Sequence, residues 1–223
     1  VTLQKGFNIN HNKINLHFRR FEFKYPILCS VAYRIIPEIL NYMAWDKYAK
    51  NDEWYDVYSL YMDSLDMKCY NEKLDGLVNR KKLRIRTYCK NYEKDNLFFE
   101  IKRKNGIVIL KDRILVSQKD ANLFIQDPFS ILNNTSYNKA FLNEFLWEFS
   151  KFQMSPKLLV HYKRKAFFGK SDPQFRVTFD YDLGFAKSNE LNFDVECDKS
   201  YSDMVIMEVK FNGAMPKWFH EII

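Results

Sequence analysis

Alternation of polar and apolar residues is the dominant pattern in this sequence, and it predicts β-strands. Residues 80–88 show it most clearly, because successive side chains of a strand point to opposite faces. One face of this stretch collects Lys82, Arg84 and Arg86, and the other collects Leu83 and Ile85. Adjacent cations on one strand face repel each other and require water, carboxylates or a bound polyanion.

The same alternation predicts seven further strands, at residues 18–25, 56–63, 98–104, 107–116, 158–168, 175–182 and 204–211. Apolar residues at helical spacing predict helices at residues 30–50, 64–74, 118–153 and from 216 onward. Asn105-Gly106 is typical of a hairpin turn, and Pro26 is expected to end the first strand because proline cannot donate to a ladder. We expect residues 184–203 to form a loop. With no repeat or linker, we expect a polar lead-in over residues 1–17 and one domain over residues 18–223.

Together these elements predict an α+β fold, an eight-stranded antiparallel β-barrel with helices packed outside it. Helices would cover the apolar face of the sheet, so the charged faces would point inward. The cations expected inside are Lys24, Arg84, Arg86, Lys102, Lys111, Arg113, Arg164, Arg176 and Lys210, and the anions are Glu22, Glu100, Asp180 and Glu208. This excess of positive charge would be costly in a dry interior and suits a wet one that binds a polyanion. The alternative is an ordinary antiparallel sheet with its basic face in solvent.

Composition narrows the ligand classes only partly. With 35 Lys+Arg against 28 Asp+Glu, the net charge is +7, which favours nucleic acids, anionic membranes or phosphorylated ligands. Only 6 glycines argue against a glycine-rich phosphate loop. The four cysteines are isolated, which is typical of reduced thiols in a cytoplasmic protein. We expect neither a membrane span nor a secretory leader, and no nucleic-acid partner, since no RNA-binding signature is present.

Seven short motifs, taken in order, resemble the polyphosphate polymerase domain of the vacuolar transporter chaperone (VTC) complex, a CYTH-like triphosphate tunnel metalloenzyme. They are Glu22-Phe23-Lys24-Tyr25, residues 59–63, residues 80–88, Phe99-Glu100-Ile101-Lys102, Arg164-Lys165-Ala166-Phe167, residues 176–180 and Glu208-Val209-Lys210. The resemblance runs from about residue 18 to the end of the chain. Each motif is weak alone, and their order carries the resemblance.

The resemblance implies a tunnel that binds a nucleoside triphosphate and inorganic polyphosphate together with Mn²⁺ or Mg²⁺. It maps the phosphate ligands to Arg84, Arg86, Lys102, Arg164 and Arg176. It maps Lys24 to the first-strand lysine and Glu208 to the metal-ligand glutamate. Many tunnel hydrolases carry a further glutamate where this chain has Arg20, which leaves the number of metals open. A membrane protein partner, at the inner face of a membrane, is a further implication.

The expected function is metal-dependent transfer of the terminal phosphate of ATP to a growing polyphosphate chain. The alternatives are a triphosphatase and a non-catalytic polyphosphate sensor. Substrate contacts are expected from Glu22, Glu100, Lys111, Arg113, Asp180 and Lys210. Other residues are expected to be structural. Lys81, Arg103, Lys163 and Lys165 would lie on the opposite, surface side; Asp63 and Asp66 would cap a helix; Tyr58 and Tyr61 would serve in packing.

Overall fold

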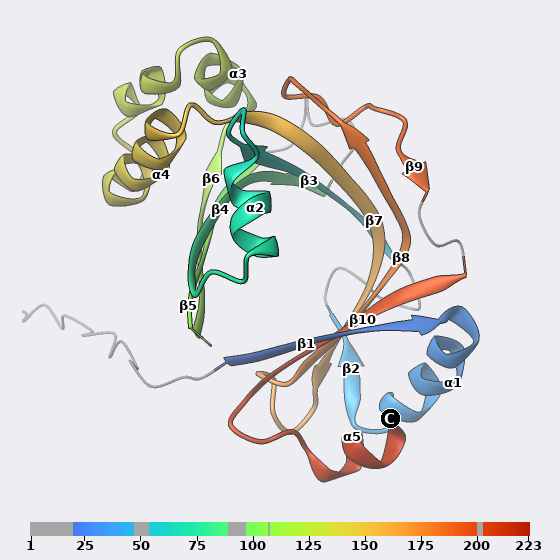
Figure 1. Cartoon of the computed structure of the whole chain (residues 1–223). Helices are drawn as coiled ribbons and strands as arrows, with labels where there is room; N and C mark the ends of the chain where they lie inside the picture. Colours follow the sequence, from blue (N-terminus) through green and yellow to red (C-terminus); the bar gives the residue numbers. More distant parts are fainter. Residues whose placement is uncertain (1–19, 47–53, 89–96, 107, 200–202) are drawn as a thin grey trace, which may run out of the picture.

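One antiparallel sheet of ten strands forms the framework of the protein (Figure 1). The computed structural model describes residues 20–46, 54–88, 97–106, 108–199 and 203–223. The lead-in expected at residues 1–17 lies outside the described residues. The fold is mixed α+β, as predicted from the alternation of helical and strand patterns.

Eight strands follow one path across the sheet. In spatial order they are β1 (Arg20–Leu28), β10 (Met204–Asn212), β8 (Arg176–Lys187), β7 (Ser155–Gly169), β3 (Tyr55–Asp63), β4 (Asn79–Thr87), β5 (Leu97–Asn105) and β6 (Val108–Val116). Off this path, β2 (Met43–Trp45) pairs with β7, and β9 (Asp198–Lys199) pairs with β8.

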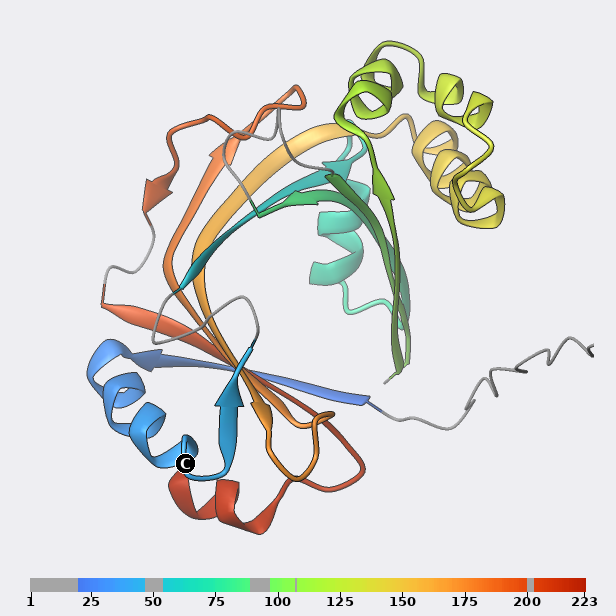
Figure 2. The ribbon, with the colours of Figure 1, turned by 180° about the vertical axis from the view of Figure 1, so that it is seen from behind.

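The predicted closed barrel is not found. No pairing joins β1 to β6 among the described residues, so the sheet is open, and it has ten strands rather than eight. Figures 1 and 2 show it bent into an arch, with β1 and β10 passing below the lower ends of β4 to β6. A barrel closes only where tilt and stagger bring the two edge strands into hydrogen-bonding register. Side-chain alternation does not encode that register.

The apolar face of the sheet lies against helices in two separate clusters. Leu83 and Ile85 belong to a cluster with residues of α3 (Gln118–Gln126), the 3₁₀ helix η3 (Pro128–Asn133) and α4 (Lys139–Lys151). Val177 and Val209 belong to a second cluster with α1 (Cys29–Ile39) and α5 (Lys217–Ile222). These four side chains are fully buried. The prediction that they point away from the charged face is confirmed.

Two local predictions are also confirmed. Gly106 joins β5 to β6 with φ +59°, a left-handed backbone conformation that glycine adopts without steric cost. Asp63 caps α2 (Lys68–Leu74), because its carboxylate accepts the backbone N–H of Cys69 at 2.8 Å and that of Tyr70 at 3.1 Å. The same role predicted for Asp66 is not found among the described residues, since its carboxylate accepts from Ser64 Oγ at 2.5 Å.

Three predicted boundaries are wrong. Pro26 lies within β1, opposite Ile206, and is tolerated there because β1 is an edge strand. The helix expected at residues 30–50 ends at Ile39 and is followed by β2. The loop expected from residue 184 is partly strand, since β8 continues to Lys187 and β9 follows at Asp198–Lys199.

Candidate functional site

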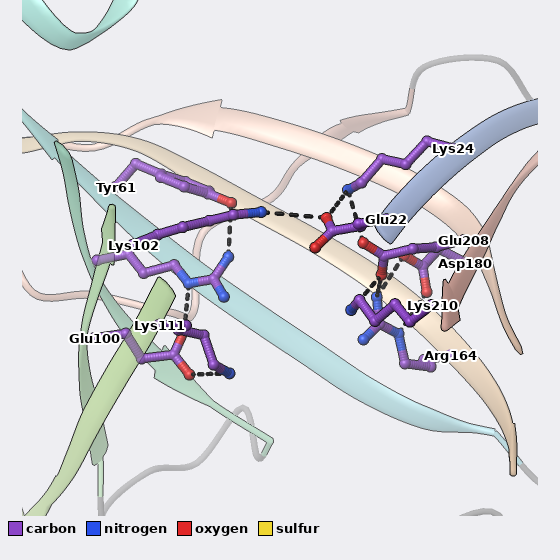
Figure 3. A network of polar contacts seen from close by, with 11 residues as sticks. Glu22, Lys24, Tyr61, Glu100, Lys102, Lys111, Arg164, Asp180, Glu208 and Lys210 are labelled. Carbon is purple, nitrogen blue, oxygen red and sulfur yellow. Dashed lines mark hydrogen bonds and ion pairs between the residues drawn. The ribbon is translucent and has the colours of Figure 1, made fainter. Parts of the chain in front are cut away.

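Charged side chains from strands across the whole sheet gather on its inner side, which we call the charged face (Figure 3). Its members are Glu22, Lys24, Ser59, Tyr61, Arg84, Arg86, Glu100, Lys102, Lys111, Arg164, Asp180, Glu208 and Lys210. They form two groups, one on β3 to β6 and the other on β1, β7, β8 and β10.

The first group is built around Glu100 of β5, whose side chain is fully buried. Arg84 Nε donates to its carboxylate at 2.5 Å, and Lys111 Nζ donates to the other oxygen at 3.2 Å. Arg84 Nη1 also donates to the hydroxyl of Tyr61 at 3.0 Å. Burial alone would raise the pKa of Glu100, but Arg84, Arg86 and Lys111 hold it at about 2. This carboxylate therefore stays ionised at any physiological pH.

The second group is built around Arg164 of β7 and Glu208 of β10. Arg164 donates in a bidentate manner to Asp180, at 2.6 and 2.7 Å. Its Nη2 also lies 3.6 Å from Glu208, which in turn accepts from Lys210 Nζ at 2.9 Å. Lys24 Nζ lies 3.4 Å from the other oxygen of Glu208. Three cations thus surround one buried carboxylate.

These contacts set the protonation state of Glu208. Burial alone would raise the pKa of its carboxyl group, but a hydrogen bond with the Glu22 carboxyl group and the positive charges of Lys210, Lys24 and Arg164 hold it far below its usual range. Glu208 is therefore an anion that neutralises nearby cations and that can also serve as an oxygen ligand.

One ion pair links the two groups across the open side of the arch. Lys102 of β5 lies 3.2 Å from Glu22 of β1, although these strands belong to opposite ends of the sheet order. Figure 3 shows Lys102 extending from the first group toward Glu22 in the second. The charged faces of both ends of the sheet therefore converge, as predicted, even though the backbone does not close.

Three predicted arginines lie outside this network of ion pairs. Arg86 is buried and donates to Ser59 Oγ at 3.0 Å, with no ion pair to any carboxylate that the structure describes. Arg113 is exposed, and its guanidinium lies 4.7 Å from the centre of the Phe98 ring. Arg176 pairs with Lys210 in the β8–β10 ladder, so it shares this face, but it is exposed and forms no ion pair within the described part of the chain. Arg86 is thus a buried cation without a direct ion pair among the described residues, although its charge still lowers the pKa of Glu100.

Packing rather than substrate contact is the predicted role of Tyr61, and the structure adds a polar contact to that role. Its hydroxyl accepts from Arg84 on the charged face. Burial alone would raise its pKa, but Arg84 and Arg86 lower it. The strand alternation indicates this position. Tyr61 lies two residues after Ser59, on the same face of β3, and the ladder partners of these two residues are Arg84 and Arg86.

The cations expected on the opposite, surface side form more ion pairs and ring contacts than predicted. Lys81 pairs with Glu148 at 2.7 Å, and Arg103 pairs with Glu144 at 2.7 Å, so both tie the sheet to α4. Lys165 is buried, with its Nζ 5.4 Å from the centre of the Trp54 ring and 6.0 Å from that of Trp45. Attraction of a cation to aromatic ring faces contributes to stabilising a lysine in this setting.

A divalent cation fits this face only if the substrate supplies part of its coordination. The described residues contain no group of three or more His, Cys, Asp or Glu side chains that could hold a metal. Glu208 and Glu22 are neighbours whose carboxylates already face lysines. Mg²⁺ is commonly held by one or two carboxylates plus substrate phosphates. The donor set is consistent with such a site.

Comparison with known proteins identifies the family and the fold. A family model described as the VTC domain matches residues 19–223. Among solved structures, a protein from Bacillus halodurans assigned as an adenylate cyclase superposes with a TM-score of 0.53 and 14% identity, covering 90% of this chain and 86% of that one. A Hippeastrum protein assigned as an adenylyl cyclase, with a dominant triphosphatase activity, gives a TM-score of 0.50 and 11% identity over 90% and 82%.

Two negative findings complete the comparison. No curated protein matches the sequence. Within the described residues, no helix has the length and apolar character needed to cross a bilayer.

Proposed function

The chain belongs to the VTC domain family, and on that premise we propose that it is a metal-dependent phosphotransferase acting on triphosphates. It transfers the terminal phosphate of ATP to a polyphosphate chain bound on the charged face. The observation that carries this proposal is the convergence of cations from both ends of the sheet, marked by the contact between Lys102 and Glu22 at 3.2 Å. Location in the cytoplasm and a membrane protein partner stay predictions.

Each side chain has a role that phosphoryl transfer needs. The guanidinium groups of Arg84, Arg86 and Arg164 bind nonbridging phosphate oxygens through their planar forks. Lys24, Lys102, Lys111 and Lys210 neutralise charge as point cations. Arg176 extends this surface at its exposed end. Phosphoryl transfer depends mainly on such charge neutralisation and on in-line positioning.

Glu208, assisted by Glu22, would hold Mg²⁺ or Mn²⁺ together with the phosphates. When bound, the metal would neutralise phosphate charge and polarise the transferred phosphorus. Lys24 and Lys210 also balance the charge of the same carboxylate.

The protonation states favour a phosphate acceptor over water. A general base that activates water works best with a pKa near the working pH. Glu100 has a pKa of about 2, and the pKa of Glu208 lies far below its usual range. Glu22 and Asp180 are both engaged by cations. Lys111 has a pKa of about 8, but its Nζ already donates to Glu100. The end of a polyphosphate chain is already anionic and needs no such base, which supports the polymerase over the hydrolase.

The decisive experiment incubates the purified protein with ATP and either Mn²⁺ or Mg²⁺ and resolves the products on a gel. Polyphosphate that lengthens with time supports the polymerase. Inorganic phosphate as the main product would instead favour a triphosphatase, the activity described for the Hippeastrum structure. Tight polyphosphate binding without turnover would identify a sensor.

Binding should also depend on phosphate number. Triphosphate and inorganic polyphosphate should bind more tightly than monophosphate, because each added phosphate meets further cations of the charged face. Affinity should fall with salt, although less steeply than at an exposed surface. Equal affinity for ATP, AMP and adenosine by calorimetry would contradict the proposal.

A further inference from the structure

Three aromatic side chains lie together at one end of the charged face, and we call them the aromatic trio. They are Tyr55 at the start of β3, Tyr88 directly after β4 and Phe98 in β5. The ring centres of Tyr55 and Tyr88 are 5.9 Å apart with an interplanar angle of 64°, and those of Tyr88 and Phe98 are 5.7 Å apart at 76°. Tyr88 is 39% exposed, so part of its ring remains accessible.

The aromatic trio adjoins both groups of cations. Phe98 is the ladder partner of Arg86, and the Arg113 guanidinium lies 4.7 Å from the centre of the Phe98 ring. Tyr55 is the ladder partner of Arg164. The exposed Tyr88 ring thus contacts two aromatic rings whose strand partners are Arg86 and Arg164, one from each group that we assign to phosphate binding.

We propose that the aromatic trio is a stacking subsite for the base of the nucleoside triphosphate, with Tyr88 as its main contact. This inference rests on the proposed function. Bases stack on aromatic side chains without sequence-specific hydrogen bonds, because every base has a π-face. An arginine over an aromatic ring, as Arg113 is over Phe98, can also stack on a base.

The subsite makes two demands on the ligand. The base must be attached to phosphates, since the neighbouring cations bind most of the ligand. Purines should be preferred over pyrimidines severalfold, because a larger ring covers more of Tyr88. Inorganic tripolyphosphate carries no base, so its binding affinity should not depend on the aromatic trio.

The test compares ATP with inorganic tripolyphosphate by calorimetry, in the wild type and in Tyr88→Ala. Stacking contributions of the usual size predict that the variant binds ATP about tenfold more weakly. Its affinity for tripolyphosphate should stay within about twofold of wild type, and its preference for ATP over UTP should disappear. Tyr88→Trp should retain ATP affinity because it keeps a stacking ring. Tyr33→Ala, which removes an exposed tyrosine of α1, is the matched control and should change neither ligand.

Several outcomes would overturn the subsite. An equal loss of affinity for both ligands in Tyr88→Ala, with Tyr88→Trp equally impaired, would mean that Tyr88 supports the phosphate site or the fold. An unchanged ratio of ATP to tripolyphosphate affinity would refute base stacking directly while leaving the proposed function intact. Failure of the wild type to bind either ligand would overturn the proposed function, and this subsite with it.

Discussion

The two faces of the sheet both carry ion pairs, but they use them differently. On the outer face, Arg103 of β5 contacts Glu144 of α4 and Asp112 of β6, and the Glu144 and Glu148 carboxylates also face Lys81. On the charged face, the ion pairs join strands of the sheet to one another, as between Arg164 and Asp180. Outer pairs with Glu144 and Glu148 attach α4 to the sheet, whereas the inner pairs hold charges in place within the sheet.

The balance of charge also differs between the two faces. Outside, the cations Lys81 and Arg103 meet three carboxylates. Inside, cations outnumber carboxylates, and the buried Arg86 forms no direct ion pair with a described carboxylate, although its charge lowers the pKa of Glu100. Buried ion pairs contribute little net stability after desolvation. The buried charged groups of this face are Arg86 and the carboxylates of Glu100, Asp180 and Glu208, whereas the surplus of positive charge lies on partly exposed side chains such as Lys24 and Lys111. That surplus is accessible to a ligand, and the predictions below test this difference between the faces.

The largest effect is expected for Glu208→Gln, which keeps the shape of the side chain and removes a metal ligand. Phosphoryl transfer should fall by at least about a hundredfold, or roughly 2.7 kcal/mol of barrier. Metal-free binding of tripolyphosphate should stay equal or tighten, because a negative charge is removed. Steady-state kinetics and calorimetry on one purified variant measure both.

If Glu208 served only to neutralise Lys24, Lys210 and Arg164, the same variant would turn over within a few-fold of wild type. Thermal unfolding of Glu208→Gln, measured in parallel, separates a lost ligand from a loosened fold.

A smaller effect is expected from replacing one arginine on each face, and it compares the two faces directly. Arg164→Gln should weaken tripolyphosphate binding by about thirtyfold, since hydrogen bonds to charged groups contribute roughly 2 kcal/mol. Arg103→Gln should leave affinity within about twofold and lower the free energy of unfolding by about 1 kcal/mol, because Arg103 and Glu144 are only partly buried. Calorimetry and chemical denaturation provide the two measurements.

Arg164→Gln also leaves Asp180 buried without its partner, which can destabilise the fold. The double variant Arg164→Met/Asp180→Leu removes both charges and should recover stability without recovering affinity. Recovery of affinity in that variant would show that Arg164 positions the fold rather than the phosphate.

The smallest effect concerns pH. Burial lowers the pKa of Lys111 to about 8. The charge of Glu100 opposes this shift, and the charges of Arg86 and Arg84 add to it. Protonated Lys111 attracts phosphate, so affinity for tripolyphosphate should fall by about three- to fivefold as pH rises from 7 to 9. Lys111→Arg keeps its charge over this range and should reduce the pH dependence to that of the ligand itself. An identical pH profile in both proteins would exclude Lys111 as the titrating group.

Alternation along the strands predicted the charged face well, because the period of a strand is fixed by backbone geometry. Arg84 and Glu100 face inward and Leu83 faces outward for that reason alone. The same alternation places Tyr61, the ladder partner of Arg84, on the charged face.

Features that depend on distant contacts could not be predicted from the pattern. Burial of Lys165 requires Trp45 and Trp54, which lie far from it in sequence. The open sheet depends on how β1 meets β6, and no local signal encodes that relation. The link between Glu22 and Lys102 joins residues 80 positions apart.

An open sheet carries a risk of self-association, because free strand edges can recruit further strands. The β6 edge has Lys111, Asp112 and Arg113 at its centre. If two β6 strands paired in antiparallel full overlap, Asp112 would face its own copy and Lys111 would face Arg113. Like charges placed directly opposite are destabilising, by roughly 0.2–1 kcal/mol per pair. The cations positioned for phosphate thus also disfavour aggregation through this edge.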